Sequence, residues 1–226
     1  MRARFRLAVV CWCLGAGLAG CRSLLVSQEP ADIVYAPGLP PASPLVPRVD
    51  SVLILERPYA RPGLDSERIV VTLPDRRLDV LAGARWSAPA VELVQALLVD
   101  SLRARAGWRE VVSDRSRFAG GYALYTEIRA FSADYERAGT APLVRVWLHG
   151  ELGRTNGRDL LRTFDAHGEA QASADRQTAV VAAFESALAT ALVQFGTEAH
   201  EAALAAEATA ALPPEARENR SPGSHQ

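Results

Sequence analysis

Apolar residues alternate with polar ones, or form short β-branched runs, along several stretches of the chain, and both patterns are typical of strands. The stretches that fit are residues 33–35, 49–56, 68–73, 77–81, 108–112, 122–135, 143–152 and 158–168. The two longest are joined across Gly139–Pro142, which favours an antiparallel hairpin. Asn156-Gly157 is a strong turn signal, so we expect the last stretch to pair next.

Two further stretches repeat their apolar residues at helical spacing. The first begins near Ser87, a candidate N-cap just before Pro89, and stops near Gly107. The second covers about Asp175 to Phe195. Strands, a helix, hairpin-linked strands and a second helix in this order predict an α+β fold. Its sheet is expected to be mainly antiparallel, with both amphipathic helices packed on one face.

The two ends of the chain differ from the middle in composition. Residues 22–48 contain six prolines, and such a density predicts an extended, semi-rigid tether. The folded domain is therefore expected over residues 49–197. Residues 198–226 begin as an alanine-rich helix end and finish in a polar tail that we expect to be disordered.

The first twenty-one residues have the pattern of a secretory signal. Arg2, Arg4 and Arg6 precede an apolar run over residues 7–18, which is shorter than the ~20 residues that span a bilayer. Leu-Ala-Gly directly before Cys21 makes this signal resemble that of a bacterial lipoprotein. The resemblance implies cleavage after residue 20 and lipidation of Cys21, including palmitate. The alternative is an ordinary signal peptide with an incidental cysteine.

Cysteine use and charge narrow the function further. Cys11 and Cys13 lie in the predicted signal, so the mature chain has no free thiol or disulfide and depends on a packed core. All 25 basic residues are arginine. Without the three in the signal, 22 basic residues face 26 acidic ones, and the mildly acidic balance argues against nucleic acid as a partner.

Several runs of residues, in their order and spacing, resemble the ABC-type transport auxiliary lipoproteins. The runs are Val52–Leu55, Pro62–Val70, Arg85–Pro89, Leu93–Leu98, Tyr122–Phe131 and Val144–Leu148, followed by a closing helix rich in Val, Ala and Leu. The resemblance implies an outer-membrane lipoprotein that meets a mammalian-cell-entry (MCE) domain protein, with an inner-membrane permease and ATPase at the other end and lipid as cargo. Arg22 follows Cys21, where aspartate would signal inner-membrane retention in enteric bacteria.

Signatures of enzymes are weak in this chain. There is no GxSxG, Walker A or HExxH motif. His149-Gly150-Glu151 resembles the start of a deaminase zinc motif, but the paired cysteines that the motif needs are missing. Asp165 and His167 share one strand face, without a serine or cysteine placed beside them by sequence. We therefore expect no catalytic residue, no metal and no cofactor.

Two candidate positions lie at the entrance to the first helix. Trp86 is interpreted as a core aromatic that joins helix to sheet, worth about 3–5 kcal/mol against alanine, with direct partner contact as the alternative. Pro89 is interpreted as part of the helix start.

A candidate interface lies on the strand face that the helices should leave open. Along residues 143–152, Arg145, Trp147 and His149 alternate with apolar residues of the opposite face, and Tyr125 and Phe131 are expected beside them on the neighbouring strand. An aromatic patch with a charged rim is typical of an interface. Cross-strand packing that steadies the sheet explains the same pattern equally well.

The sequence thus favours a non-enzymatic auxiliary lipoprotein that docks at the outer-membrane end of a trans-envelope lipid transporter. Its expected partners are the MCE protein with its permease and ATPase, and a second copy of the chain. The alternative is a structural or assembly lipoprotein without a transport partner.

Overall fold

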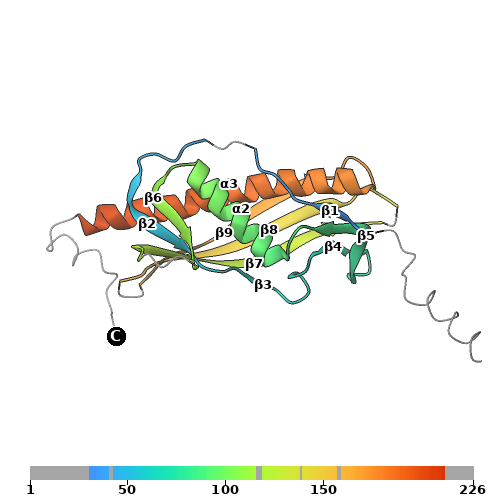
Figure 1. The fold of residues 1–226 in the computed structure, drawn as a ribbon, viewed down its shortest axis with the longest axis horizontal. Helices are drawn as coiled ribbons and strands as arrows, with labels where there is room; N and C mark the ends of the chain where they lie inside the picture. Colours follow the sequence, from blue (N-terminus) through green and yellow to red (C-terminus); the bar gives the residue numbers. More distant parts are fainter. Residues whose placement is uncertain (1–30, 41–42, 116–118, 138, 157–158, 212–226) are drawn as a thin grey trace, which may run out of the picture. The chain divides into compact units, whose positions relative to one another are not determined.

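The computed structural model describes residues 31–40, 43–115, 119–137, 139–156 and 159–211. The described residues from Ile33 onward form one compact unit (Figure 1). Cys21, the signal and the tail beyond residue 211 lie outside the described residues, so the predictions for them are not tested by the structure.

The sheet is organised around its longest strand, β7. The strands are β1 (Ile33–Tyr35), β2 (Val49–Leu55), β3 (Tyr59–Ala60), β4 (Arg68–Thr72), β5 (Leu78–Trp86), β6 (Trp108–Ser113), β7 (Tyr122–Asp134), β8 (Leu143–Arg154) and β9 (Leu160–Gln171). One edge of β7 pairs antiparallel with β8, and β8 pairs antiparallel with β9. The other edge of β7 pairs in succession with β2, β3 and β4, all parallel to it. Beyond them, β5 joins β4 antiparallel, β1 joins β5 and β6 joins β2.

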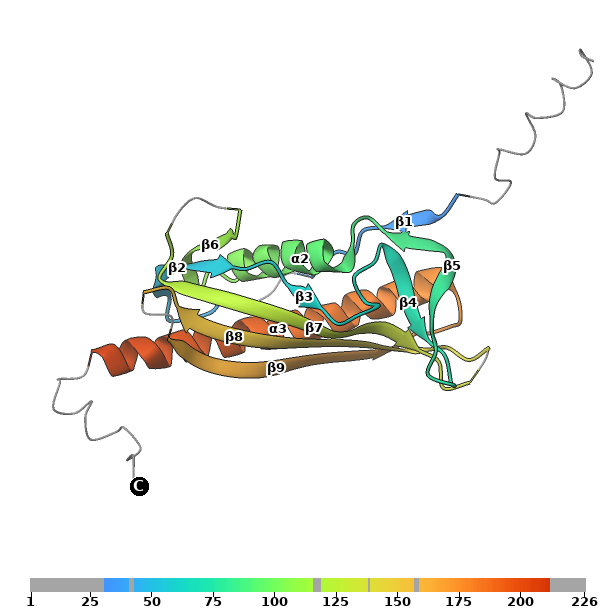
Figure 2. The same cartoon turned by 90° about the horizontal axis from the view of Figure 1, so that it is seen from below.

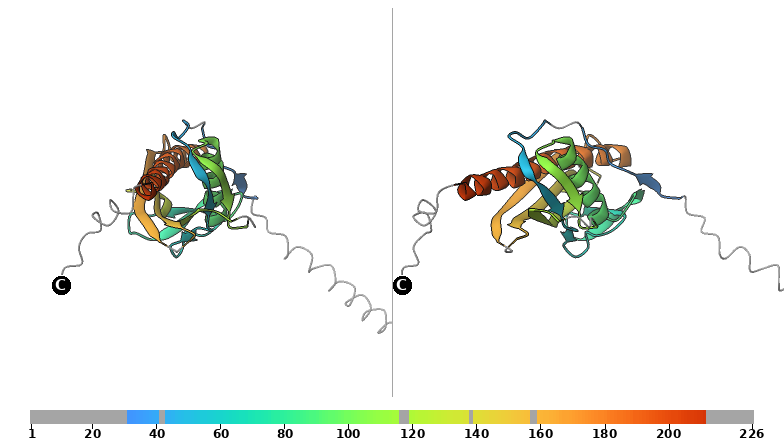
Figure 3. Two further views of the ribbon diagram at one scale, coloured as in Figure 1. Left: turned by 90° about the vertical axis from the view of Figure 1, so that its left-hand side faces the viewer. Right: turned by 60° about the vertical axis from the view of Figure 1, so that its left-hand side comes forward.

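Both helices lie on one side of this sheet, which curves around them (Figure 3). They are α2 (Ala90–Ala104) and α3 (Gln177–Ala210). The structure therefore confirms the α+β class, with a mixed and mostly antiparallel nine-stranded sheet. The hairpin of β7 and β8 and the pairing of β9 are also as expected. The parallel run of short strands along β7 was not foreseen.

The start of α2 differs from the prediction. Pro89, not Ser87, occupies the N-cap position and offers no side-chain cap. The unpaired amides of the first turn find partners in the preceding loop instead, because Asp65 Oδ1 accepts the Val91 N–H at 3.2 Å and the Ser66 carbonyl accepts that of Ala90. A loop distant in the sequence therefore caps the helix, instead of the local serine that was expected to do so.

Helix α3 runs without a break to Ala210, so the second predicted helix and the alanine-rich helix end expected from residue 198 are one helix. It packs against β8 and β9, and a Cβ added at Gly168 of β9 would stand 1.8 Å from the Ala187 carbonyl oxygen. Only glycine allows this approach. By length and composition α3 could cross a membrane. However, 61% of its apolar 18-residue stretch is buried inside the protein, as in the core helix of a soluble domain.

The proline-rich segment is not a free tether along its whole length. Residues 33–35 pair with β5, and Leu45 is buried with its N–H on the Arg105 carbonyl. The Pro47 carbonyl accepts a hydrogen bond from His200 at 2.9 Å. Extended, proline-rich backbone can lie on a domain surface because its few N–H groups need few partners. The ordered domain therefore begins near residue 33 rather than 49.

A β-bulge in β7 overturns the predicted position of Phe131. Ile128 lies opposite Leu148 and Ala130 lies opposite Trp147, so Arg129 is an extra residue that reverses the alternation beyond it. Phe131 consequently turns inward and is 1% exposed. Its ring packs between Trp86 and Phe184, with centroids 5.7 and 5.1 Å away. Trp86 is itself fully buried, as its interpretation as a core residue requires.

Candidate functional site

The face of β7, β8 and β9 that points away from α3 carries the candidate site; in Figure 2 these strands lie in front of the helix. Along β8 the side chains alternate as expected, with Val144, Val146 and Leu148 buried against the helices. Trp147 and His149 lie on the opposite face. We call this surface the open face.

Asp165 of β9 is the centre of the open face. Its Oδ1 accepts hydrogen bonds from Trp147 Nε1 at 2.8 Å, from an Arg129 guanidinium nitrogen at 2.9 Å and from His149 Nδ1 at 3.1 Å. Partial burial raises the pKa of the Asp165 carboxyl, but the hydrogen bonds and the Arg129 charge outweigh it, so the pKa is lowered overall. Asp165 is therefore a carboxylate at neutral pH and holds three side chains in place.

Glu127 extends the network toward β3. It accepts hydrogen bonds from Arg129 Nε at 2.7 Å and from Arg61 Nε at 3.2 Å. The bond from Arg129 is the main reason that the pKa of Glu127 is lowered. Both guanidinium groups lie over the indole of Trp147, 5.6 Å from its centroid for Arg61 and 5.4 Å for Arg129. Such stacking is a cation–π contact.

Trp147 is consequently less exposed than the sequence suggested. The two arginines cover its ring, and His167 packs against it with centroids 5.0 Å apart. The exposed aromatics of the open face are two tyrosines. Tyr125 is 52% exposed and Tyr59 is 63% exposed. Tyr59 lies opposite Glu127 in the β3–β7 register, one side-chain row from Tyr125.

Shallow depressions flank Tyr125. One of about 270 Å³ is lined by both tyrosines, Arg57, Glu127 and His149, among others. Another of about 380 Å³ runs from Tyr125 toward Leu160, which is also exposed. The open face thus combines a network of hydrogen-bonded, charged side chains with the exposed rings of two tyrosines.

The predicted residues are brought together only in part. Tyr125, Trp147 and His149 share the surface, whereas Arg145 lies further along β8 in a separate ion-pair group with Asp134 and Glu169. Phe131 is in the core. Counting along residues 122–135 also puts Glu127 and Arg129 on the face of Tyr125. Sequence reasoning missed Tyr59, did not bring Arg61 to this face, and set Asp165 aside. Only the cross-strand register, with Asp165 opposite His149, would have identified Asp165 as a partner.

The open face contains only part of a catalytic arrangement among the described residues. His149 and Asp165 form the base-and-carboxylate half of a triad, but His149 Nε2 faces Glu151 at 3.8 Å and hydrogen-bonds to no nucleophile among the described residues. No group of three or more metal-ligating side chains occurs within the described ranges.

The chain resembles a known protein family in sequence and several solved structures in fold. The family model described as "ABC-type transport auxiliary lipoprotein component" matches residues 37–195. A crystal structure of protein XCC0632 from Xanthomonas campestris superposes with a TM-score of 0.71 at 23% identity, over 78% of this chain and 99% of that one. A crystal structure of an uncharacterized protein superposes with a TM-score of 0.56 at 18% identity, covering 76% and 99% of the two chains. No curated protein matches the chain.

Proposed function

The chain belongs to the ABC-type transport auxiliary lipoprotein family, and from this premise we propose that it is the non-enzymatic, outer-membrane subunit of a trans-envelope lipid transporter of the MCE type. As a member it is an auxiliary lipoprotein component of ABC-type transport. The lipid cargo is what the family resemblance implies, whereas residues of this chain support the outer-membrane anchor and the contact with the MCE protein.

The anchor is lipidated Cys21. The basic start, the short apolar run and Leu-Ala-Gly before the cysteine support it, and Arg22 in the next position favours outer-membrane sorting. Several acyl chains on one residue give durable attachment. Replacing Cys21 with serine should leave a folded domain that no longer fractionates as a lipoprotein. A mature amino terminus without acyl chains in mass spectrometry would end this assignment.

The observation that carries the docking proposal is the pair of exposed tyrosines above a pre-ordered network. Aromatic and arginine side chains dominate binding energy at interfaces. Arg61, Arg129 and Trp147 are already held by Glu127 and Asp165. Binding of a partner therefore costs little conformational entropy at these side chains. The occupant we propose is the periplasmic end of the MCE protein, since an auxiliary component needs a contact with its transporter.

A pull-down from detergent extracts tests this. Tyr125→Ala and Trp147→Ala should each weaken recovery of the MCE protein, and the double variant should abolish it, while the melting temperature changes little. Val193→Ala is the matched control, because Val193 is an exposed apolar residue of α3 on the other side of the sheet.

The alternatives give different results in the same experiment. Wild-type recovery by the double variant would place the interface elsewhere. If the variant dissociates a complex of identical chains in analytical ultracentrifugation but keeps the MCE protein, the occupant is a second copy. If no transporter subunit is recovered with any variant or with the wild type, a structural or assembly lipoprotein is the better account.

A further inference from the structure

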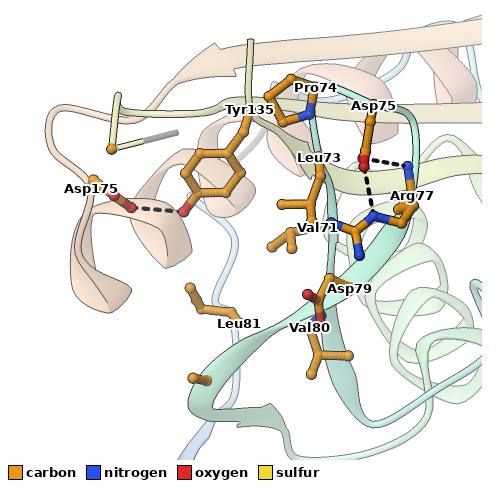
Figure 4. Close-up of a pocket in the computed structure, with 12 residues that line it drawn as sticks. Val71, Leu73, Pro74, Asp75, Arg77, Asp79, Val80, Leu81, Tyr135 and Asp175 are labelled. Atoms are coloured by element: carbon orange, nitrogen blue, oxygen red, sulfur yellow. Dashed lines mark hydrogen bonds and ion pairs between the residues drawn. The ribbon is translucent and has the colours of Figure 1, made fainter. Parts of the chain in front are cut away.

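Three turns meet around an apolar cavity at the end of the domain where α3 begins (Figure 4). They are the β4–β5 turn, the β7–β8 turn and the loop from β9 to α3; we call this region the turn end. The cavity measures about 540 Å³, which is within the range of small-molecule sites. Val71, Leu73, Val80 and Leu81 are among its apolar lining residues.

The cavity wall is well ordered. Tyr135 bridges two of the turns, since its hydroxyl donates to Asp175 Oδ1 at 2.8 Å and its N–H donates to the Thr72 carbonyl. Burial, together with the bond to Asp175, raises the pKa of Tyr135 to about 12, so the phenol stays neutral. The neutral phenol therefore keeps its hydrogen bond to Asp175 beside the apolar opening.

Unpaired arginines gather at this end. Within the described ranges, four arginine side chains make no hydrogen bond or ion pair with another described residue. They are Arg76, Arg115, Arg137 and Arg176. Three of the four lie in the three turns. Arg76 and Arg176 adjoin cavity-lining residues, and Arg137 is two residues from the lining residue Tyr135. Arg76 also has a φ of 66°, a left-handed conformation that glycine adopts at less cost. Arg76 thus places a long cationic side chain at a backbone position that favours glycine.

Acidic side chains of the turn end equal the arginines in number, but two of them are engaged by other residues. Asp75 is paired with Arg77 at 2.7 Å, and Asp175 is engaged by Tyr135. Asp79 and Glu136 remain beside the free arginines. Over residues 73–79, 135–137 and 175–176 the count is four arginines against four acidic residues. A balanced, interleaved surface of this kind suits a zwitterionic headgroup, with a phosphate for the arginines and an amine for the carboxylates.

The chain enters the domain at the same end. Figures 1 and 2 both show β1, the β4–β5 turn and the start of α3 together. Ile33, Val34, Leu78 and Val80 of β1 and β5 are exposed apolar residues there. Residues 22–32 reach roughly 40 Å when fully extended, whereas the 34 residues of α3 run for about 50 Å. With Cys21 in the bilayer, the tether is too short for the far end of α3 to face the membrane.

We propose that the turn end docks on the phospholipid bilayer that holds the anchor, with lipid phosphates on Arg76, Arg137 and Arg176 and apolar lipid in the cavity mouth. This proposal rests on the lipid anchor of the proposed function, but not on the MCE partner. The open face stays clear of the membrane and free for a partner.

Site-specific labelling tests the docking. The described part of the chain has no cysteine, so a single introduced one is the only free thiol once Cys21 is acylated. The lipidated full chain carrying Val80→Cys, labelled with an environment-sensitive dye, is reconstituted in phosphatidylcholine–phosphatidylethanolamine vesicles. Its emission should shift to the blue, and quenching by aqueous iodide should fall several-fold. The same dye at Leu160→Cys, an exposed position at the other end of β9, should behave as in water.

Arginine variants sharpen the result. Arg76→Gly combined with Arg137→Gln and Arg176→Gln should restore iodide quenching at position 80, although the glycine suits the backbone of the turn. Arg115→Gln, which removes the unpaired arginine elsewhere, should not. Equal quenching at positions 80 and 160 would overturn the docking, and shielding only after phosphatidylglycerol is added would overturn the zwitterionic assignment. Acyl analysis of the amino terminus by mass spectrometry separates either failure from loss of the anchor.

Discussion

Two tryptophans on opposite faces of one sheet show how differently the same residue is used. Trp86 is fully buried, touches Phe131 and Phe184, and its Nε1 has no hydrogen-bond partner among the described residues. Trp147 donates its Nε1 to Asp165 and lies beneath two guanidinium groups. The inner ring contributes to stability through burial. The outer ring orders polar neighbours, and its main effect should be on binding.

The largest effect is expected from the inner ring. Trp86→Ala removes a fully buried side chain and should lower the free energy of unfolding by about 3–5 kcal/mol. Urea titration measures this. Trp86→Phe is the control, and it should cost clearly less because the indole N–H makes no bond that would be lost. A loss of under 1 kcal/mol for Trp86→Ala would contradict the view that this face supplies the stability.

Removing the bulge should change which side chains of β7 point toward the core and which point toward the open face. Deletion of Arg129 would restore strict alternation, and either Phe131 turns outward or the register of β7 and β8 slips. We expect a loss of about 3 kcal/mol, the lower end of the range for truncating a buried phenylalanine. Arg129→Ala keeps the extra residue and should cost much less. Equal melting temperatures for the two variants would show that the bulge does not set the position of Phe131.

A smaller effect concerns the contact between α3 and the proline-rich segment. Burial lowers the pKa of His200, although its Nε2–H donates to the Pro47 carbonyl. The unfolded chain therefore takes up a proton at a higher pH than the folded one. Stability should be full above the ordinary histidine value of 6.5 and should fall as the pH drops below it. Melting temperatures between pH 7.5 and 5.5 measure this, and His200→Gln should flatten the slope. If the melting temperature of His200→Gln depended on pH as steeply as that of the wild type, the effect would come from other histidines.

The smallest effect on folding is expected at the centre of the open face. Asp165→Asn keeps the shape of the side chain but removes the charge that holds Arg129 and His149. Since the carboxylate is partly exposed, the loss should be below about 1 kcal/mol. Partner recovery should nevertheless fall, because the network under the tyrosines loses its order. A large loss of stability would mean that the open face is structural after all.

The sequence predicted those features that follow from local pattern. The alternation along β8, the hairpin with β7 and the burial of Trp86 all come from side-chain period or turn chemistry. It failed where a distant contact decides the outcome. Asp65 rather than Ser87 serves the first turn of α2, and Ser43, Leu45 and Pro47 of the proline-rich segment are held by Arg105 and His200.

The candidate site was predicted in part for the same reason. Tyr125, Trp147 and His149 could be placed on one face by counting along strands. Phe131 could not, because nothing in its neighbourhood marks Arg129 as a bulge. Asp165 needed the register between β8 and β9, and Arg61 needed the parallel pairing of β3 with β7. Long-range pairing of this kind is not encoded in the local period of a strand.

The most direct test of the central claim, that the open face contacts the transporter, is photo-crosslinking in living cells. A photoreactive amino acid replaces Tyr125 in the full-length lipoprotein and, in a separate strain, Val193 of α3. We expect the residue at position 125 to crosslink to the MCE-domain protein, and the one at position 193 to give no such product. Crosslinks to that protein from position 193 but not from position 125 would contradict the account.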